Sequence, residues 1–371
     1  MAEPAVLSGR EQKILGIIET TRAKRPKLRD EHITMAHGAG GKATQTLIEG
    51  LLVPALAAPP AADTPGVLAE LADAAALELD GAALAFTTDS YVVKPLRFPG
   101  GSIGDLAVNG TVNDLAVSGA RPLWLSLSLI LEEGLATDEL RAEVQAIAAA
   151  AAAAGVAVVT GDTKVVERGH ADGMYICTAG IGRRDPRARL SPNALRPGDR
   201  ILLSGQIGDH GTAIMLARGQ FELDADVESD TCSLWPAVEA LLAAAGPSLH
   251  CLRDATRGGV ASVLNELARA STVAMTIDEA AVPVRPEVAG AAEILGIDPM
   301  YVANEGRLVA FVAADAAETA LAALREVPGC EAAAEIGEVR TDPPGMVLVR
   351  TSFGGRRVMD QLVGDPLPRI C

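Results

Sequence analysis

The sequence predicts an α+β protein of two domains followed by a short tail. The chain has 371 residues, which is more than one hydrophobic core usually organises. Runs in which apolar and polar residues alternate, as in half-buried strands, are interspersed with runs of helical periodicity. Turn residues and a new apolar strand begin near Arg187, and the pattern ends after Leu362. We therefore expect an extension over 1–32, domains over 33–186 and 187–362, and a flexible tail over 363–371.

Composition and charge exclude several classes of partner. Aromatic residues make up 3% of the chain, too few for a platform that stacks nucleic-acid bases. The formal net charge of −16 would repel nucleic acid and anionic membranes. The longest mostly apolar run, 147–159, is too short to span a bilayer, and the five cysteines form neither a CxxC nor an even set. We expect a cytoplasmic protein that binds no nucleic acid and no membrane.

The first domain is predicted to begin with a strand, "HITMA", a glycine turn, "HGAGGK", and a helix after Lys42. The run "ALAFTTDSYVV" is typical of a strand, and "GSIGDLAVNGTVNDLAVSGARP" has helical spacing up to Gly119. "LWLSLSLIL" alternates like a strand, and an Ala-rich helix follows from about Asp138 to Ala154 with Thr137 as its N-cap. "VAVVTGDT" and "MYICTAGIG" complete the predicted sheet.

The second domain is predicted to alternate strands and helices from "DRILLSG" onward. "RDATRGGVASVLNELA" indicates a glycine turn that enters an apolar helix. "GMVLVRTSFGGRRVMD" is typical of a closing hairpin.

The turn "HGAGGK" is a candidate phosphate site, because exposed amides at a helix start attract anions. It fails the P-loop pattern: Ala36 occupies the first glycine position and Ala43 the Ser/Thr position. It meets a loose dinucleotide fingerprint at Gly38, Gly40 and Ala43, but no acid ends a second strand about 20 residues further on. A phosphate contact and a bare turn both fit this stretch.

The helix through "GDLAVNGTVNDLAVSG" carries a polar stripe. Asp105, Asn109 and Asn113 recur every fourth residue, and Asp114 lies beside them. Solvent-facing helix surfaces usually carry Lys and Glu rather than this combination. The stripe is therefore either a wet face or a binding face.

Two further aspartates follow strands: Asp89 after "LAFTT" and Asp162 after "VAVVTG". Mg²⁺ prefers oxygen ligands, and when it carries ATP it needs only a few carboxylates besides phosphate oxygens. A single such aspartate is often a turn residue, but the acids together favour a nucleotide–magnesium site. Lys164 would then act near the phosphates as a cation or proton-transfer group, or else face solvent.

The second domain adds candidates in glycine-rich loops. Thr256 and Arg257 enter a glycine turn that suits phosphate contact. Glu305 lies in a glycine-flanked loop before the strand "RLVAFVA", where a carboxylate can be buried and act as a base. His210 lies in a glycine cluster and fits a structural role, and the five histidines show no metal-ligand spacing, so no zinc is predicted. Cys371 ends the chain.

Together these stretches resemble the HypE family of hydrogenase maturation proteins, which are carbamoyl dehydratases in the superfamily typified by aminoimidazole ribonucleotide (AIR) synthetase. The motifs are "HGAGGK", "TTDSYVV", "GDLAVNGTVNDLAVSGARP", "TGDTKVV", "RDATRGG", "ANEGRLV" and the terminal "PRIC", and they span about 33–371. The resemblance implies a two-domain PurM/AIR synthetase-like fold, an N-terminal domain that closes a shared β-barrel in a homodimer, a C-terminal α/β domain and a flexible tail.

The resemblance also implies an activity. A HypF-type carbamoyltransferase would load the Cys371 thiol, ATP-dependent dehydration would turn the thiocarbamate into a thiocyanate, and a HypC–HypD-type complex would accept the cyano group on the iron destined for [NiFe] hydrogenase. By carry-over from the motifs, Asp89, Asp114 and Asp162 would hold Mg²⁺, and Lys164 and Glu305 would transfer protons. The expected ATP contacts are Asp105, Asn109, Asn113, Gly40, Gly41, Lys42, Thr256 and Arg257.

The tail is predicted to be detached from the core, with Pro366 and Pro368 stiffening it. One alternative is a sibling ATP-dependent synthetase, such as a selenophosphate synthetase, which would need a reactive cysteine or selenocysteine in the first glycine loop. Another is a non-enzymatic scaffold whose tail thiol carries a metal or a mixed disulfide, in which case the aspartates would be idle. The resemblance does not extend to the residues before Ile33.

Overall fold

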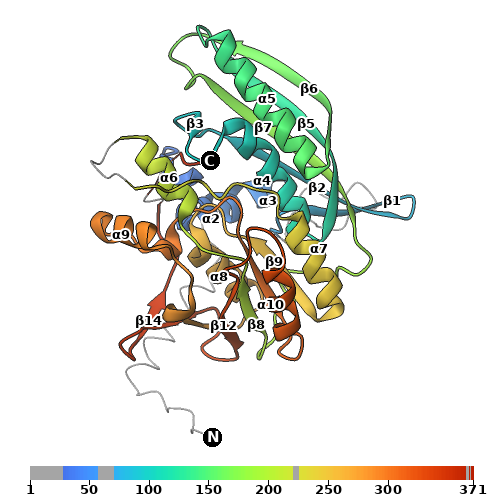
Figure 1. Ribbon diagram of the computed structural model, residues 1–371, viewed down its shortest axis with the longest axis vertical. Coiled ribbons are helices and arrows are strands. Elements are labelled where there is room, and N and C mark those ends of the chain that lie inside the picture. Colours follow the sequence, from blue (N-terminus) through green and yellow to red (C-terminus); the bar gives the residue numbers. More distant parts are fainter. Residues whose placement is uncertain (1–27, 57–70, 220–224, 365–366, 368) are drawn as a thin grey trace, which may run out of the picture.

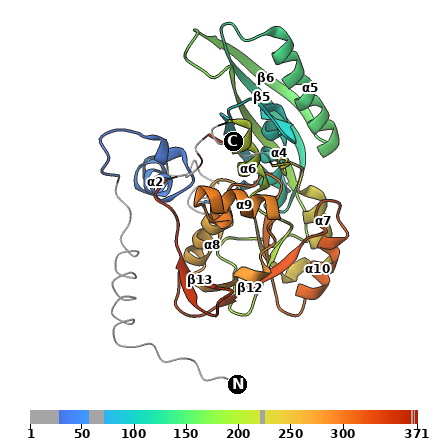
Figure 2. The ribbon, with the colours of Figure 1, turned by 60° about the vertical axis from the view of Figure 1, so that its left-hand side comes forward.

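The computed structural model describes residues 28–56, 71–219, 225–364, 367 and 369–371. Two β-sheets organise these residues, one in each half of the chain, and lie one above the other in Figure 1. The chain end marked C lies between the two halves (Figure 2). The predicted α+β fold of two domains is therefore present.

The first sheet has five strands in the order β1-β2-β7-β5-β6. Its strands are β1 (Ala75–Leu79), β2 (Ala82–Tyr91), β7 (Met174–Arg184), β5 (Ala120–Glu132) and β6 (Ala157–Val166), with a small ribbon of β3 (Arg97–Phe98) and β4 (Gly101–Ser102) beside it. β5 and β6 are parallel, and the other neighbours are antiparallel. β6 is an edge strand that is exposed along nearly its whole length.

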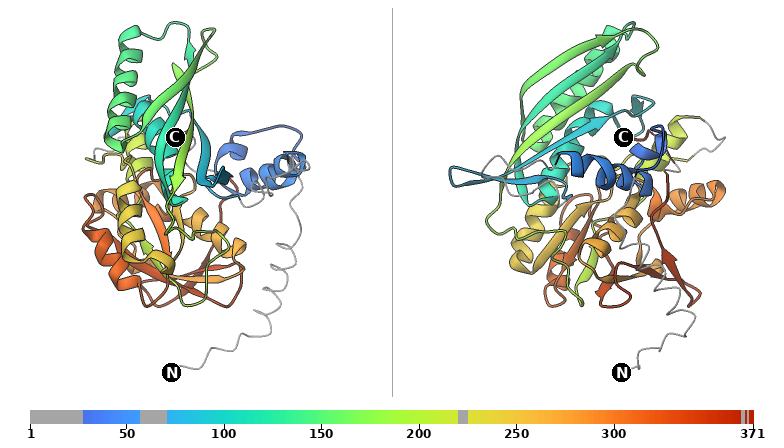
Figure 3. Two further views of the ribbon diagram at one scale, coloured as in Figure 1. Left: turned by 90° about the vertical axis from the view of Figure 1, so that its right-hand side faces the viewer. Right: turned by 180° about the vertical axis from the view of Figure 1, so that it is seen from behind.

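Helices cover one face of this sheet, and no helix of the described residues covers the other face (Figure 3, left). The covering helices are α4 (Ile103–Val117) and α5 (Thr137–Ala154). α4 approaches the sheet closely, because a Cβ at Gly110 would lie 2.2 Å from the hydroxyl of Tyr91. On the sheet, Phe86 and Trp124 remain 41% and 49% exposed.

A buried carboxylate fixes the start of α4. Glu143 of α5 is fully buried, its Oε2 accepts a hydrogen bond from the amide of Gly104 at 3.1 Å, and its Oε1 lies 2.8 Å from Nε of Arg97. An acid at a helix N-terminus satisfies free amides and interacts favourably with the helix dipole. α5 therefore holds the helix that carries the polar stripe.

The second sheet has seven strands in the order β14-β13-β10-β12-β8-β11-β9, of which β10 and β13 are parallel. The strands are β8 (Arg200–Leu203), β9 (Leu249–Asp254), β10 (Ala274–Asp278), β11 (Leu308–Val312), β12 (Ala334–Arg340), β13 (Val347–Arg350) and β14 (Arg356–Met359). The helices are α6 (Asp209–Ala217), α7 (Trp235–Ala244), α8 (Gly259–Ala270), α9 (Pro286–Leu295) and α10 (Ala317–Arg325), with 3-10 turns at Gly246–Ser248, Glu279–Ala281 and Pro299–Tyr301.

This second sheet is buried on both faces. Along β8, Ile201 and Leu203 pack into the core that includes α8, whereas Leu202 packs into the core that includes α7 and α10. Alternating side chains point to opposite faces of a strand, so an uninterrupted apolar run is what a doubly covered strand requires.

The N-terminal described segment lies beside the main body (Figure 2). It contains a 3-10 turn (Met35–Gly38), α2 (Lys42–Leu47), a π-helical turn (Ile48–Leu52) and α3 (Val53–Leu56). The predicted strand "HITMA" is wrong, because the chain turns at Met35. His37 Nδ1 accepts a hydrogen bond from the amide of Thr34, which favours a turn over a ladder.

Most other predicted elements are confirmed, including α4, the Ala-rich helix α5 with Gly155 as its left-handed C-cap, and the antiparallel β13–β14 hairpin. Thr137 is the first residue of α5, and Ala136 is the N-cap. The boundary predicted at Arg187 lies between β7 and β8. The exact bounds of the four predicted segments stay predictions. Among the described residues, no helix combines the length and hydrophobicity needed to cross a lipid bilayer.

Candidate functional site

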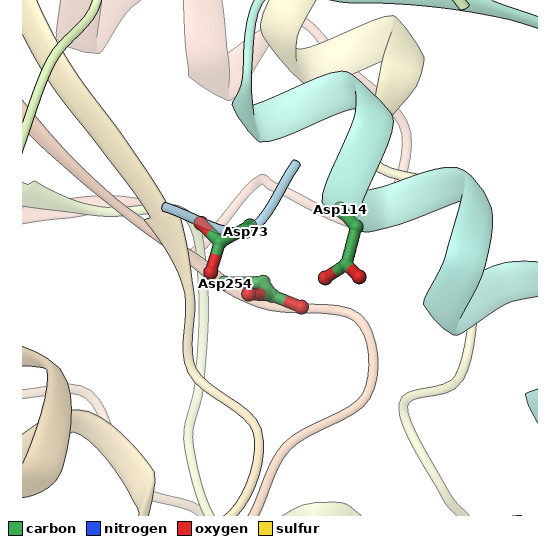
Figure 4. Close-up of side chains that lie close together, drawn as sticks. All are labelled: Asp73, Asp114 and Asp254. Carbon is green, nitrogen blue, oxygen red and sulfur yellow. The ribbon is translucent and has the colours of Figure 1, made fainter. Parts of the chain in front are cut away.

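Three aspartates meet at the junction of the two sheets (Figure 4). Asp73 precedes β1, Asp114 lies on α4, and Asp254 ends β9. Each contributes a carboxylate oxygen, and these oxygens lie within 4.8 Å of one another. Oxygen-only carboxylate sets suit Mg²⁺, so the donor chemistry of this cluster fits that ion.

Neighbouring side chains hold the cluster in place. Thr87 Oγ1 lies 2.7 Å from Asp114 Oδ2 and 2.8 Å from the carbonyl of Asp73, so its single proton can go to either. Arg253 Nε pairs with Asp73 Oδ1 at 2.8 Å, and its Nη2 lies 3.2 Å from Glu266. Among the described residues, Asp73 is thus the one carboxylate of the three that forms an ion pair.

The cluster is electrostatically unfavourable without a cation. Burial first, and then the charge of Asp73, raise the pKa of Asp254 to about 8. Burial likewise raises the pKa of Asp73 to about 6, against the opposing effect of Arg253. The pKa of Asp114 is raised well above its usual range by burial and then by Asp254. A divalent cation would relieve this repulsion.

Asp89 extends the acidic surface along β2. Because side chains alternate in a strand, Asp89 shares a face with Thr87 and therefore points toward the side on which α4 lies. Its charge contributes to the raised pKa values of Asp114 and Asp254. Asp89 Oδ1 lies 4.0 Å from Nη2 of Arg257.

Glu305 is a buried acid aimed into the same region. It is 3% exposed, and its Oε1 has no hydrogen-bond partner among the described residues. Burial and then the charge of Asp89 raise the pKa of Glu305 well above its usual range, and Asp230 and Asp254 add to the effect. A buried carboxyl with a free oxygen and a raised pKa is a candidate general base.

Arg257 connects this region to the end of the chain. Its Nη1 donates to the carbonyl of Gly38 at 2.9 Å. The negative charge of Cys371 is the largest cause that raises the pKa of Arg257, followed in the same direction by Asp89 and Glu305. Cys371 therefore lies in the electrostatic reach of the candidate site.

The described tail residues are docked, which corrects the prediction of a detached tail. Leu367 and Ile370 are 5% and 2% exposed. The carbonyl of Ile370 accepts a hydrogen bond from His210 Nε2 at 2.7 Å, and that of Cys371 from the amide of Val92 at 3.2 Å. Two apolar anchors and satisfied carbonyls outweigh the absence of a helical or strand pattern.

Two further contacts hold the tail at Arg369, one at its guanidinium and one at its carbonyl. The guanidinium pairs with Asp172, and the carbonyl accepts a hydrogen bond from Arg218. Asp172 also pairs with Lys94 at 2.8 Å, and the hydrogen bond from Lys94 is the largest cause that lowers the pKa of Asp172 to about 2.

The glycine turn contacts the residues at which the tail begins, Leu362 and Val363. The amides of Lys42 and Ala43 donate to the carbonyls of Leu362 and Val363 at 2.9 and 3.3 Å. Gly41 has no room for a side chain, since a Cβ would lie 2.5 Å from the carbonyl of Leu362. These amides, expected to face phosphate, are thus used by main-chain carbonyls in this conformation.

The lysine and the second glycine of this turn also lie against the second half of the chain. Lys42 Nζ lies 2.7 Å from Asp360. Gly40 has a φ of +74°, and a Cβ there would lie 2.8 Å from Cβ of Arg257. Thr256, also an expected phosphate contact, accepts a hydrogen bond from the amide of Gly259 at the start of α8.

The polar stripe on α4 faces the second half of the chain, and its role in ATP binding stays a prediction. Asn109 donates to Thr231 Oγ1 at 3.3 Å. Asn113 is 1% exposed, donates to the carbonyls of Cys232 and Glu305 at 2.9 and 3.1 Å, and accepts from the amide of Leu234 at 2.7 Å. Asp105 accepts from Ser102 at 2.9 Å at the start of the helix. The wet-face alternative is therefore wrong for the two asparagines.

Asp162 and Lys164 are not brought to the cluster within one chain. They lie together on β6, where Lys164 Nζ pairs with Asp162 Oδ2 at 2.9 Å, and its hydrogen bond lowers the pKa of Asp162. Two strands, β7 and β5, separate β6 from β2. At ~4.8 Å per strand spacing, the strand of Asp162 is roughly 14 Å from that of Asp89.

Sequence reasoning missed two of the three clustered acids. Asp89 and Asp162, predicted to follow strands, lie inside β2 and β6, because both strands run on past the apolar residues that suggested their ends. Asp254 is the acid that does end a strand, before a glycine turn. Asp73 precedes a short strand and gives no comparable signal. Its place in the cluster results from the packing of the chain before β1 against Arg253.

Family models match both halves of the chain. The model for the N-terminal domain of AIR synthase related proteins matches residues 71–184, and the model for the C-terminal domain matches residues 196–349. With two sheets and an acid cluster at their junction, the chain is an AIR synthase related protein of two domains.

Individual relatives narrow the family. Carbamoyl dehydratase HypE of Rhodobacter capsulatus is 51% identical over 344 residues, which cover 93% of this chain and 99% of the relative. A crystal structure of HypE in complex with ATP matches with a TM-score of 0.75 and 46% identity, covering 92% and 100% of the two chains. A HypE–HypF complex matches with a TM-score of 0.77 and 43% identity, covering 81% and 97%. The chain belongs to the HypE family of carbamoyl dehydratases, which confirms the resemblance.

Proposed function

We propose that this chain uses ATP to dehydrate a carbamoyl group on the sulfur of its own Cys371, which leaves a thiocyanate. The observation that carries the proposal is the docking of the tail: the charge of the terminal cysteine reaches Arg257, next to Asp89 and the free carboxyl oxygen of Glu305. The solved structure of a relative with ATP supports nucleotide use.

The reaction balances without a redox partner. The carboxamide oxygen attacks the γ-phosphorus of ATP, and the bond between that phosphorus and its bridging oxygen breaks, which releases ADP. The amide nitrogen then loses its two protons, the carbon–oxygen bond breaks, and phosphate leaves with the former carbamoyl oxygen. Carbon and nitrogen are left joined by a triple bond as the thiocyanate on Cys371.

The residues of the site suit these steps. Glu305 can accept a proton from the amide nitrogen, because its Oε1 is buried and unpartnered. Arg257 can neutralise the developing phosphate charge, and Thr256 lies beside it for phosphate contact. Asp89 and Asp114, joined by Asp73 and Asp254, would hold Mg²⁺, which supplies charge neutralisation at a transferring phosphoryl group.

A homodimer would bring Asp162 and Lys164 into the reaction. Both lie on an exposed edge strand, beside a sheet face that exposes Phe86 and Trp124 and that no described helix covers. Contiguous exposed apolar surface of this kind marks an interaction site. Closing a shared barrel across this face would let the two β6 side chains of one subunit serve the cluster of the other, with Asp162 as a ligand and Lys164 in proton transfer.

The partners follow from the same scheme. The complex of a relative with HypF supports a HypF-type carbamoyltransferase as the carbamoyl donor. A HypC–HypD-type complex would accept the cyano group on iron for [NiFe] hydrogenase. The cytosol suits this cycle, because its reducing conditions keep thiols such as Cys371 free.

Intact-protein mass tests the proposal. Incubation with the transferase and a carbamoyl donor should add one carbamoyl group, mapped to the peptide that contains Cys371, and ATP should then remove one water from that adduct. ATP hydrolysis without any adduct on Cys371 would favour a sibling synthetase instead.

A further inference from the structure

The main chain around Glu305 is held by side chains rather than by strand pairing. Asp230 Oδ1 accepts a hydrogen bond from the amide of Glu305 at 3.0 Å, and its Oδ2 accepts from the amide of Gly306 at 3.3 Å. On the other side, Asn113 Nδ2 donates to the carbonyl of Glu305 at 3.1 Å. Both peptide units that flank the candidate base are therefore fixed by polar side chains.

The two segments also touch directly. A Cβ at Gly306 would lie 1.8 Å from the carbonyl oxygen of Asp230, so no other residue fits there without movement. A displacement of Asp230 must therefore shift the loop that carries Glu305. Close packing of this kind transmits small movements because interiors have little free volume.

Asp230 is a buried carboxylate whose charge is compensated by its neighbours. Its side chain is completely buried and lies 3.6 Å from Nε of Arg307. Two amide donors and a nearby guanidinium compensate the cost of burying the carboxylate. It is not a member of the aspartate cluster found among the described residues.

Glu305 depends on this support. Its Oε1 has no partner in the described chain, so no hydrogen bond at this oxygen sets the direction of the carboxyl. The position of its backbone must then define where the carboxyl reaches. A misplacement of ~1 Å at a reacting group can cost about 100-fold in rate.

Ser229, the residue next to Asp230, contacts the histidine that holds the docked tail. Ser229 Oγ lies 2.8 Å from Nδ1 of His210, whose Nε2 donates to the carbonyl of Ile370. A change confined to the Asp230 side chain therefore removes no hydrogen bond of the docked tail, and reaches His210 only through the charge of Asp230. This separation makes the effect on Glu305 measurable on its own.

We propose that Asp230 is a positioning residue for Glu305, which it aims at the tail-bound group through two main-chain hydrogen bonds. The inference rests on the proposed function, in which Glu305 accepts a proton from the amide nitrogen. Asp230 touches neither substrate nor nucleotide in this role and acts only through Glu305.

The test begins with Asp230→Asn. Asparagine keeps one acceptor oxygen but places an NH₂ group against an amide donor, so the loop shifts. We expect ATP-dependent dehydration of the carbamoylated tail to slow by at least ~10-fold, with ATP affinity and carbamoyl uptake unchanged. Glu228→Gln is the matched control, because Glu228 is an exposed acid two residues away and should keep the wild-type rate.

A double-mutant cycle separates positioning from a general structural role. In a Glu305→Gln background, Asp230→Asn should cause no further loss, because the group that it positions is gone. Equal losses in both backgrounds, or a wild-type rate for Asp230→Asn alone, would overturn the proposal. If Asp230→Asn does not fold, Asp230→Ser carries the same cycle, since its hydroxyl can accept from the amide of Glu305. A wild-type rate for Glu305→Gln would refute the base itself, and this inference with it.

Discussion

Removing one charge from the aspartate cluster should stabilise the metal-free protein while it weakens the response to magnesium and ATP. Asp254→Asn is the sharpest such change, because it replaces a buried carboxylate with a neutral group of the same shape. Burial and the charge of Asp73 raise the pKa of Asp254 from 3.8 to about 8. The folded protein therefore holds a proton on this carboxyl over a pH range in which the unfolded chain has released it.

The magnitude follows from proton linkage. Each pH unit above the unfolded-state value costs ~1.4 kcal/mol of folding free energy until the folded pKa is reached. At pH 7 the cost for Asp254 alone is on the order of 4 kcal/mol. Part of it is shared with Asp73 and Asp114, so we expect Asp254→Asn to raise the free energy of unfolding by ~1–3 kcal/mol without metal.

The raised pKa of Asp254 also determines how the stability difference between the variant and the wild type changes with pH. Below the unfolded pKa both states are protonated and the two proteins should unfold alike. As the pH rises toward 8, the wild type loses stability and the gap should widen. Thermal unfolding with a chelator at pH 5 and pH 8 measures it, with Asp226→Asn, an exposed aspartate, as the control.

When Mg²⁺ and ATP are added in the same experiment, the wild type should gain more stability than the variant. Mg²⁺ with ATP at ~100 times its Kd should stabilise the wild type by about 2.7 kcal/mol, and the variant by less. A metal-free Asp254→Asn protein that unfolds below the wild type at pH 8, or a gap that narrows between pH 5 and pH 8, would refute the reasoning.

Three further predictions concern the tail, the helix that carries the stripe and the subunit interface. Asp172→Asn removes the ion pair to Arg369, so alkylation of Cys371 by a thiol reagent should accelerate several-fold; an unchanged rate would show that Asp172 does not retain the tail. Glu143→Gln weakens the buried contact at the start of α4 and should lower the free energy of unfolding by about 1–3 kcal/mol in a denaturant titration, whereas no change would contradict its anchoring role. Lys164→Ala and Glu305→Gln proteins should each dehydrate the carbamoylated tail much more slowly than the wild type, yet regain part of the rate when mixed and allowed to exchange subunits. A mixture that stays as slow as the separate variants despite exchange would argue against a site shared between subunits.

Local patterns predicted the elements whose stability is local. The helix over Ile103–Val117 and the β13–β14 hairpin follow from periodicity and turn residues, and the structure confirms both. The prediction that Asp89 follows a strand is wrong, because β2 continues to Tyr91, whereas Asp254 does end β9 and could have been found from its strand end. These features depend on spacing within a few residues.

Features that depend on packing between distant segments could not be predicted from local sequence patterns. Asp73 joins the cluster through its ion pair with Arg253, which lies 180 positions further along the sequence. Periodicity does not encode such a pairing. The docking of the tail depends on His210 and Asp172, which carry no signal of tail binding. The glycine turn was recognised as a turn, but its partners, the carbonyls of Leu362 and Val363, come from the other end of the chain.

In the proposed reaction, the carbamoyl oxygen leaves with phosphate. The most direct measurement loads the Cys371 thiol with a carbamoyl group labelled with oxygen-18 and follows one turnover with unlabelled ATP in unlabelled water. The account predicts that the label appears in the released inorganic phosphate, one atom for each thiocyanate formed. Unlabelled phosphate, with the label in water or still on the tail, would contradict it.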